Sequence, residues 1–120
     1  MSPQVTRLDH VQLAMPAGGE DEARGFYDRL LGLPEIEKPE GVRSSGGVWF
    51  AGAVEVHLGV EASFRPARKA HPCFVVAGYR ELLDHLAAAG HPSTPDDRIE
   101  GAPRSFVDDP FGNRIELRPE

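Results

Sequence analysis

Four side chains that can bind a metal ion occupy corresponding places in the two halves of the chain. His10 and His57 lie near the start and the end of the first half, and His71 and Glu116 lie near the start and the end of the second. The two opening residues, like the two closing ones, are about 60 positions apart. A duplicated unit with a candidate ligand near each end predicts a metal site built between two halves.

The available donors restrict the chemistry of such a site. The chain has one cysteine, Cys73, so a thiolate cluster is excluded and any metal must be held by histidine and carboxylate. Three such ligands leave open coordination positions, which a divalent ion needs to act as a Lewis acid on substrate oxygens. Two histidines with one carboxylate would equally suit non-haem iron(II). The ligand set alone therefore leaves the reaction type open.

The strands that must position these residues follow from alternation of apolar and polar side chains. His10 falls on the face opposite Val11 and Leu13, as expected for a half-buried strand. Glu55 and His57 share one face of a later strand, so alternation alone cannot choose between them as the fourth ligand. Trp49 has the same parity and is a candidate wall of the substrate cleft.

Each half of the sequence predicts a strand, a helix and then two or three strands. In the first half, acidic residues at 20–22 open a helix that Gly32 ends. In the second half, a helix over about 79–89 is followed by Gly90 as a cap. The expected strands cover residues 6–14, 48–51, 54–60, 71–76, 104–107 and 113–117. On the last hairpin, Arg104 offers a bidentate anion contact and Phe106 is a further candidate for lining the cleft.

Length and charge narrow the class of protein. At 120 residues the chain fits one domain, with module one over about 5–61, a linker over about 62–69 and module two over about 70–119. A formal charge of −6 and an isoelectric point near 5.3 predict no nucleic-acid partner. We expect no membrane span, since no apolar run reaches the roughly 20 residues required. The N-terminus lacks a secretory pattern, which favours a cytoplasmic location.

Three segments together resemble the vicinal oxygen chelate superfamily, which contains glyoxalases, extradiol dioxygenases and bleomycin- or fosfomycin-resistance proteins. The segments are Leu8-Asp9-His10-Val11, Phe26-Tyr27-Asp28-Arg29-Leu30-Leu31-Gly32-Leu33 and Asp109-Pro110-Phe111-Gly112-Asn113-Arg114-Ile115-Glu116-Leu117. Their order and spacing cover nearly the whole chain. The resemblance implies an α+β fold of two βαβββ modules that form a curled mixed sheet around a cleft.

The resemblance also implies roles for the candidate residues. By position, His10, His71 and Glu116 match metal ligands of the family, and His57 falls where some glyoxalases place a glutamate. A local match of Val56-His57-Leu58-Gly59 to the family pattern favours His57 over Glu55. The implied cofactor is a divalent ion (zinc, nickel, manganese or iron), with Glu116 and His57 as candidate catalytic groups.

The expected activity is a glyoxalase-like lyase or isomerase that chelates vicinal oxygens of a small molecule. The alternatives are a one-domain iron(II) extradiol dioxygenase and a non-enzymatic binding protein of the bleomycin-resistance kind. We expect a homodimer, which either pairs two complete cups or exchanges modules so that each cleft draws on both chains.

Overall fold

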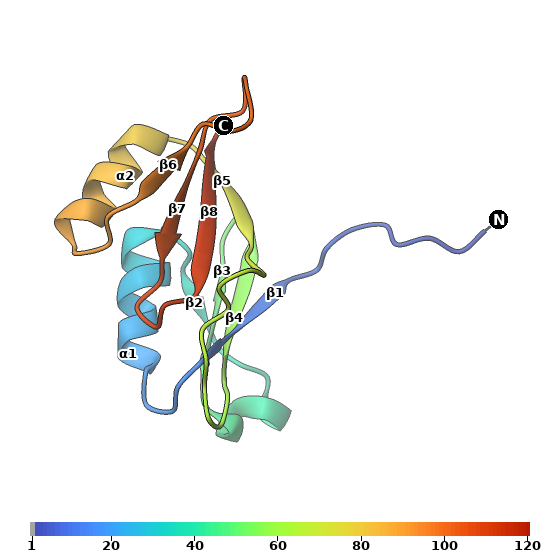
Figure 1. Ribbon diagram of the computed structural model, residues 1–120. Helices are drawn as coiled ribbons and strands as arrows, with labels where there is room; N and C mark the ends of the chain where they lie inside the picture. Colours follow the sequence, from blue (N-terminus) through green and yellow to red (C-terminus); the bar gives the residue numbers. More distant parts are fainter. Residues whose placement is uncertain (1) are drawn as a thin grey trace.

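Two four-stranded sheets, each with helices on one face only, make up the protein (Figure 1). This computed structural model describes residues 2–120. The first sheet has the strand order β1-β4-β3-β2 and the second has the order β5-β8-β7-β6. In both, the first strand of the module pairs in parallel with its last strand, and the other pairings are antiparallel. The two halves therefore repeat one topology.

The elements of each half follow the same order. The first half contains β1 (Val11–Met15), α1 (Glu20–Ala23), η1 (Arg24–Leu30), β2 (Glu35–Ile36), the 3₁₀ helix η2 (Glu40–Ser45), β3 (Val48–Ala51) and β4 (Glu55–Val60). The second half contains β5 (Cys73–Val76), α2 (Tyr79–Ala88), β6 (Thr94–Asp96), β7 (Arg104–Asp108) and β8 (Arg114–Pro119).

Alternation along the strands separates a buried face from an open one. In β1 and β4 the side chains of Leu13, Met15, Val56 and Leu58 are buried under the first helix. The intervening residues of these strands point to the face that carries no helix, as the twofold period of a strand requires. His57 is one of them, so the candidate ligands and the core use opposite faces of the same strands.

The first helix continues without interruption from α1 into η1, where the backbone is wound as a π-helix. Its acidic first turn complements the positive end of the helix dipole. Phe26 and Tyr27 are its fully buried large side chains. Gly32 ends the helix with φ +74°, in the left-handed region that favours glycine.

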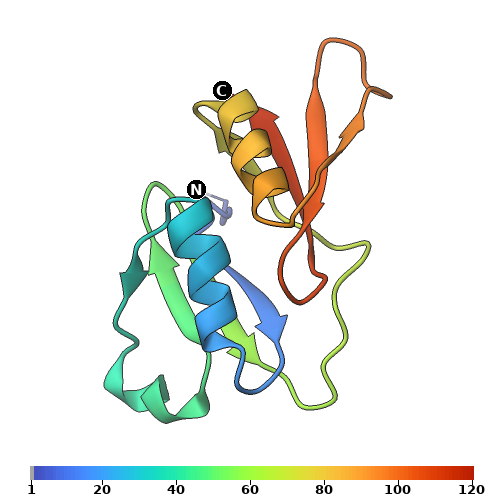
Figure 2. The same cartoon turned by 90° about the vertical axis from the view of Figure 1, so that its left-hand side faces the viewer.

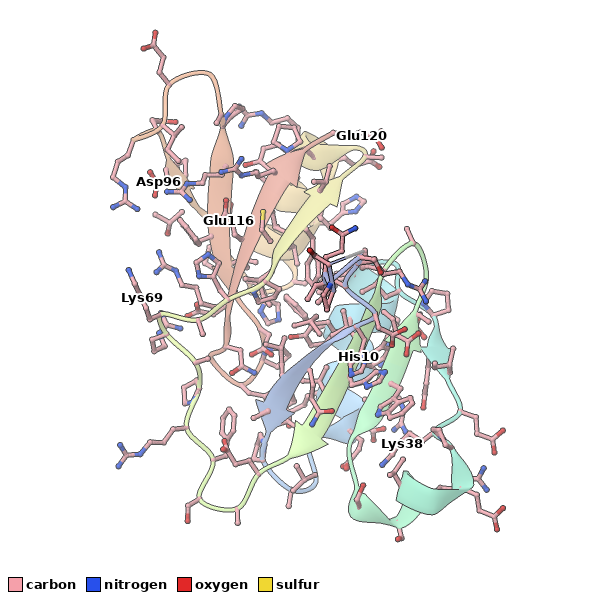
Figure 3. The ribbon with its side chains drawn as sticks, turned by 90° about the vertical axis from the view of Figure 1, so that its right-hand side faces the viewer. His10, Lys38, Lys69, Asp96, Glu116 and Glu120 are labelled. Carbon is pink, nitrogen blue, oxygen red and sulfur yellow. The ribbon has the colours of Figure 1, made fainter. Side chains whose placement is uncertain are left out.

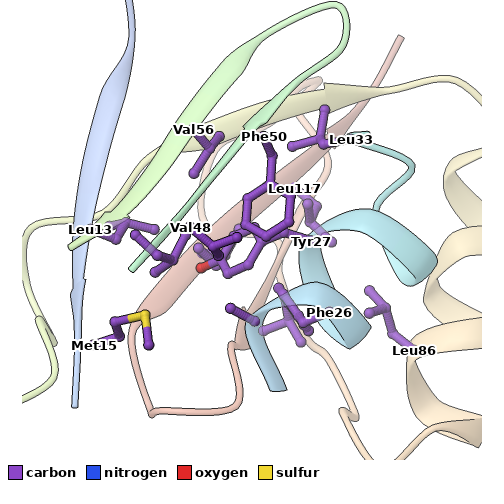
Figure 4. Packing of buried hydrophobic residues seen from close by; sticks show 14 residues of the cluster. Leu13, Met15, Phe26, Tyr27, Leu33, Val48, Phe50, Val56, Leu86 and Leu117 are labelled. Carbon is purple, nitrogen blue, oxygen red and sulfur yellow. The ribbon is translucent and has the colours of Figure 1, made fainter. Parts of the chain in front are cut away.

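One buried cluster joins the two halves (Figure 4). Leu86 of α2 and Leu117 of β8 belong to the same apolar cluster as Phe26 of η1. The hydroxyl of Tyr27 also donates a 2.7 Å hydrogen bond to buried Asp109 of the second half. Because helix contacts and this hydrogen bond hold the modules together, their sheets are fixed side by side rather than face to face.

The layers are clearest from the two sides of the molecule. Figure 2 shows both helices on one side, and Figure 3 shows the open faces of both sheets on the other. This confirms the predicted α+β class with two βαβββ modules, and the two sheets do not close into a barrel. The bounds predicted for the domain and its modules stay a prediction.

The N-terminal segment differs from the expectation. The strand predicted from residue 6 begins only at Val11, whose partner Val56 is the second residue of β4. Residues 2–8 extend away from the sheets (Figure 1), with Val5 93% and Leu8 81% exposed.

Candidate metal centre

His10 and His57 lie together on the open face of the first sheet. The His57 ring is stacked between Trp49, at 3.6 Å between ring centroids, and His10, at 4.1 Å. Trp49 is the cross-strand neighbour of His57 in the β3–β4 pair. The Nδ1 atom of His10 donates to the carboxylate of Asp9 at 2.9 Å. Since that nitrogen carries the proton, the Nε2 atom of a neutral His10 presents a lone pair.

Glu55 and His57 are both on this face, as alternation predicts. The Nε2 atom of His57 lies 2.7 Å from a carboxylate oxygen of Glu55. The side chain of His57 is only 4% exposed, whereas that of Glu55 is 34% exposed. The structure therefore pairs the two candidates for the fourth ligand, with Glu55 the more accessible of the two.

His71 and Glu116 form the corresponding pair on the second sheet. His71 lies two residues before the start of β5, and its Nδ1 atom donates to the backbone carbonyl of Lys69 at 2.8 Å. Its Nε2 atom then faces Glu116, 3.1 Å away. A carbonyl partner on one ring nitrogen is the arrangement that commonly orients a metal-binding histidine.

Glu116 is a buried carboxylate surrounded by donors. Arg118 donates to it at 2.8 Å and Arg104 at 3.4 Å. Burial alone would raise the pKa of Glu116, but hydrogen bonds from Arg118, His71, Arg104 and Cys73 lower this pKa to about 2. Glu116 is therefore ionised at neutral pH, as a metal ligand must be.

The predicted cleft residues divide between the two sheets. Trp49 lies on the first sheet against His57, and Phe106 lies on the second sheet, 5.4 Å from His71 between ring centroids. The guanidinium of Arg104 lies 5.1 Å from the centre of the Phe106 ring. Arg118 follows Glu116 by two residues on β8, so the two side chains lie on the same face of the sheet, where they are in contact. Cys73, the single cysteine of the chain, is exposed.

The two pairs do not meet within one chain. Figure 3 shows His10 and Glu116 on separate sheets that open to the same side. Over residues 2–120, no cluster of three or more histidine, cysteine or acidic side chains is close enough to hold an ion. A groove of about 800 Å³ runs between β1 and β5, and both sheets line it, with Gln12 on one side and His71 on the other.

The chemistry of the donors nevertheless fits a divalent ion. His10 and His71 each have Nδ1 bonded to an oxygen acceptor, which directs Nε2 outward. Glu116 supplies an ionised carboxylate beside His71. Two imidazoles and a carboxylate, with Glu55 or His57 as a fourth group, are donors that zinc, nickel, manganese or iron accept. Over residues 2–120 these donors stay on two separate sheets.

Two βαβββ modules, each with one sheet face that carries no helix, define the class of fold. The family model for the glyoxalase/bleomycin resistance protein/dioxygenase superfamily matches residues 7–117. The chain belongs to this superfamily. Among curated proteins, none matches the sequence significantly.

Solved structures show the same fold. A protein assigned to the glyoxalase family from Bacillus anthracis is 43% identical, with 100% of this chain and 99% of that chain covered and a TM-score of 0.93. The fosfomycin resistance protein FosX from Listeria monocytogenes is 16% identical, with 98% and 95% covered and a TM-score of 0.77. Lactoylglutathione lyase from Agrobacterium tumefaciens is 22% identical, with 98% and 96% covered and a TM-score of 0.67. At these lower identities the likeness shows the fold alone.

The helices of the described chain are too short or too polar to cross a bilayer.

Proposed function

We propose that the protein is a metal-dependent enzyme of the lyase or isomerase type. In this proposal a divalent ion held by His10, His71 and Glu116, with His57 or Glu55 as a fourth group, chelates vicinal oxygens of a small molecule. The ion supplies Lewis-acid polarisation of those oxygens.

The orientation of the two histidines is the observation that carries the proposal. In His10 and His71 alike, Nδ1 donates to an oxygen and Nε2 is left as the metal-binding nitrogen. The Nε2 atom of His71 and a carboxylate oxygen of Glu116 face each other at 3.1 Å. With a proton on Nε2 this is an ion pair, and loss of that proton converts the two groups into a pair of ligands.

A second copy of the chain would complete the site. To bring His10 and Glu116 together within one chain, its two sheets would have to face each other. That movement would break the packing of Leu86 with Phe26 and the hydrogen bond between Tyr27 and Asp109. A twofold dimer instead sets the first sheet of one chain against the second sheet of its partner and forms two equal clefts. The open edges support this arrangement, because β1 and β5 each have one unpaired side and Val75 on β5 is 67% exposed.

The residues around the ion have distinct tasks in this proposal. Trp49 and Phe106 form aromatic walls that exclude water from the bound substrate. Glu55 and His57, linked at 2.7 Å, can take up or return a proton next to the chelated oxygens. Glu55 is the better placed of the two to reach a substrate, since His57 is enclosed between two rings.

One observation favours a second candidate, a binding cup without metal. Glu116 already accepts hydrogen bonds from Arg118 and Arg104, and His57 is already bonded to Glu55, so these candidate ligands have polar partners without a metal ion. An iron(II) extradiol dioxygenase is the third candidate, because its usual ligands are also two histidines and a carboxylate.

Elemental analysis of protein purified without chelator or nickel affinity tests the proposal. Wild-type protein should contain about one equivalent of zinc, nickel, manganese or iron per chain, and His10→Ala and Glu116→Ala should each lose it. His85→Ala is the matched control, since His85 is an exposed histidine of α2 and should leave the metal content unchanged.

The outcomes separate the candidates. Tightly held zinc, nickel or manganese would favour a lyase or isomerase, whereas iron with oxygen uptake on a catechol would favour the dioxygenase. Absence of metal in wild-type protein, together with no uptake when each ion is offered, would contradict the enzymatic proposal and leave the binding cup.

A further inference from the structure

The open face of the second sheet carries a group of arginines, one of which has no carboxylate partner among residues 2–120. Arg104, Arg114 and Arg118 all lie on this face of β7 and β8. Arg114 lies over the Phe106 ring at 3.9 Å and, over residues 2–120, forms no ion pair with a carboxylate. This face is thus a candidate for holding a negatively charged group.

Arg104 is the most enclosed of these arginines. Its side chain is 15% exposed, and its guanidinium contacts Glu116 at 3.4 Å and Asp96 at 3.2 Å. Its Nε atom is buried and has no hydrogen-bond partner among residues 2–120. A buried N–H without an acceptor is costly, so it marks a place where an acceptor is missing.

Glu116 occupies the position between Arg104 and Arg118. One of its oxygens, Oε2, accepts from both arginines, while the other, Oε1, faces His71. If this carboxylate binds a divalent ion, as proposed above, its charge is shared with that ion. Two guanidinium groups then lie beside a dication, and their mutual repulsion favours a further anion at the same place.

We propose that Arg104 and Arg118 bind the acidic group of the substrate, so that the substrate class is a small organic oxyanion. This rests on the proposed function, because the oxyanion lies beside the chelated oxygens. In the metal-free chain, the carboxylate of Glu116 accepts hydrogen bonds from both arginines and therefore competes with an external anion for them. A carboxylate, phosphonate or phosphate matches the planar fork of a guanidinium, which donates two parallel hydrogen bonds.

Anion titration of metal-free protein tests the pair without any loaded enzyme. The probes are inorganic phosphate and glycolate, followed by calorimetry on wild-type protein and Glu116→Gln. The glutamine keeps the size of the side chain and removes the competing charge, so affinity for at least one probe should rise about tenfold or more. Adding Arg104→Gln or Arg118→Gln to this variant should abolish the gain, whereas adding Arg80→Gln, an exposed arginine of α2, should not.

Preference for glycolate would assign a carboxylate substrate, and preference for phosphate would assign a phosphonate or phosphate. No gain in Glu116→Gln, or an equal loss with Arg80→Gln, would overturn the inference. If Glu116→Gln melts below the assay temperature, Arg104→Gln and Arg118→Gln alone must each weaken wild-type binding of millimolar phosphate. Absence of metal binding in wild-type protein, with the anion results above obtained, would overturn the proposed function alone.

Discussion

Mixing two inactive variants should restore metal binding if each cleft draws on two chains. In the proposed dimer, one cleft takes His10 from the first chain and Glu116 from the second, and the other cleft takes them in reverse. A dimer of one His10→Ala chain and one Glu116→Ala chain therefore has one cleft with both residues intact and one with neither. Each homodimer of a single variant has no intact cleft.

The size of the effect follows from symmetry. Random pairing of equal amounts makes half of the dimers mixed, and half of their clefts are intact, so about one quarter of wild-type metal content should return. A site within one chain predicts none. As a matched control, wild type mixed with the double variant should retain about one quarter if the cleft is shared, but about one half if it is not.

The assay is elemental analysis after co-expression of two differently tagged chains and isolation of the dimer pool. Native mass spectrometry should establish that mixed dimers have formed. If mixed dimers are present and the two single variants together still bind no metal, the reasoning that divides the site between two sheets of different chains is refuted.

Three further results are expected. Tyr27→Phe should lower the free energy of unfolding by about 2 kcal/mol, because buried Asp109 loses a charge-assisted hydrogen bond, and chemical denaturation should show this with metal content unchanged. Leu86→Ala should cost about 3 kcal/mol in the same assay, because it leaves a cavity between the modules next to Phe26. In metal-free protein the pKa of Glu116 is lowered from 4.5 to about 2, so its stabilisation is present above pH 4.5 and is lost as pH falls towards 2. Denaturation at pH 5 and pH 3 should differ less in Glu116→Gln than in wild type, by at most about 2 kcal/mol, and an unchanged difference would contradict this.

The sequence predicted the strands that carry the candidate ligands because local alternation determines which side chains share a face. His57 and Glu55 were expected on one face of their strand, and they are neighbours there. The last hairpin, over 104–117, was also expected, but the buried hydrogen bond from Tyr27 to Asp109 of this hairpin was not, since the two residues are 82 positions apart. No local pattern records a contact of such separation.

The Arg104–Glu116–Arg118 arrangement shows the same limit. Strand parity puts Glu116 and Arg118 on one face, but their partner Arg104 is brought alongside only by the register of β7 against β8. Likewise the sequence predicted a site between two halves without saying whether those halves belong to one chain.

By itself, the sequence determined the superfamily, the duplicated βαβββ order and the residues offered to the open faces, because each depends on patterns within a few residues. Only the tertiary structure decided how the modules meet. Burial of Leu86 with Phe26 sets the sheets side by side, which separates His10 from Glu116 within the chain. That packing depends on long-range burial of apolar surface, which local periodicity does not specify.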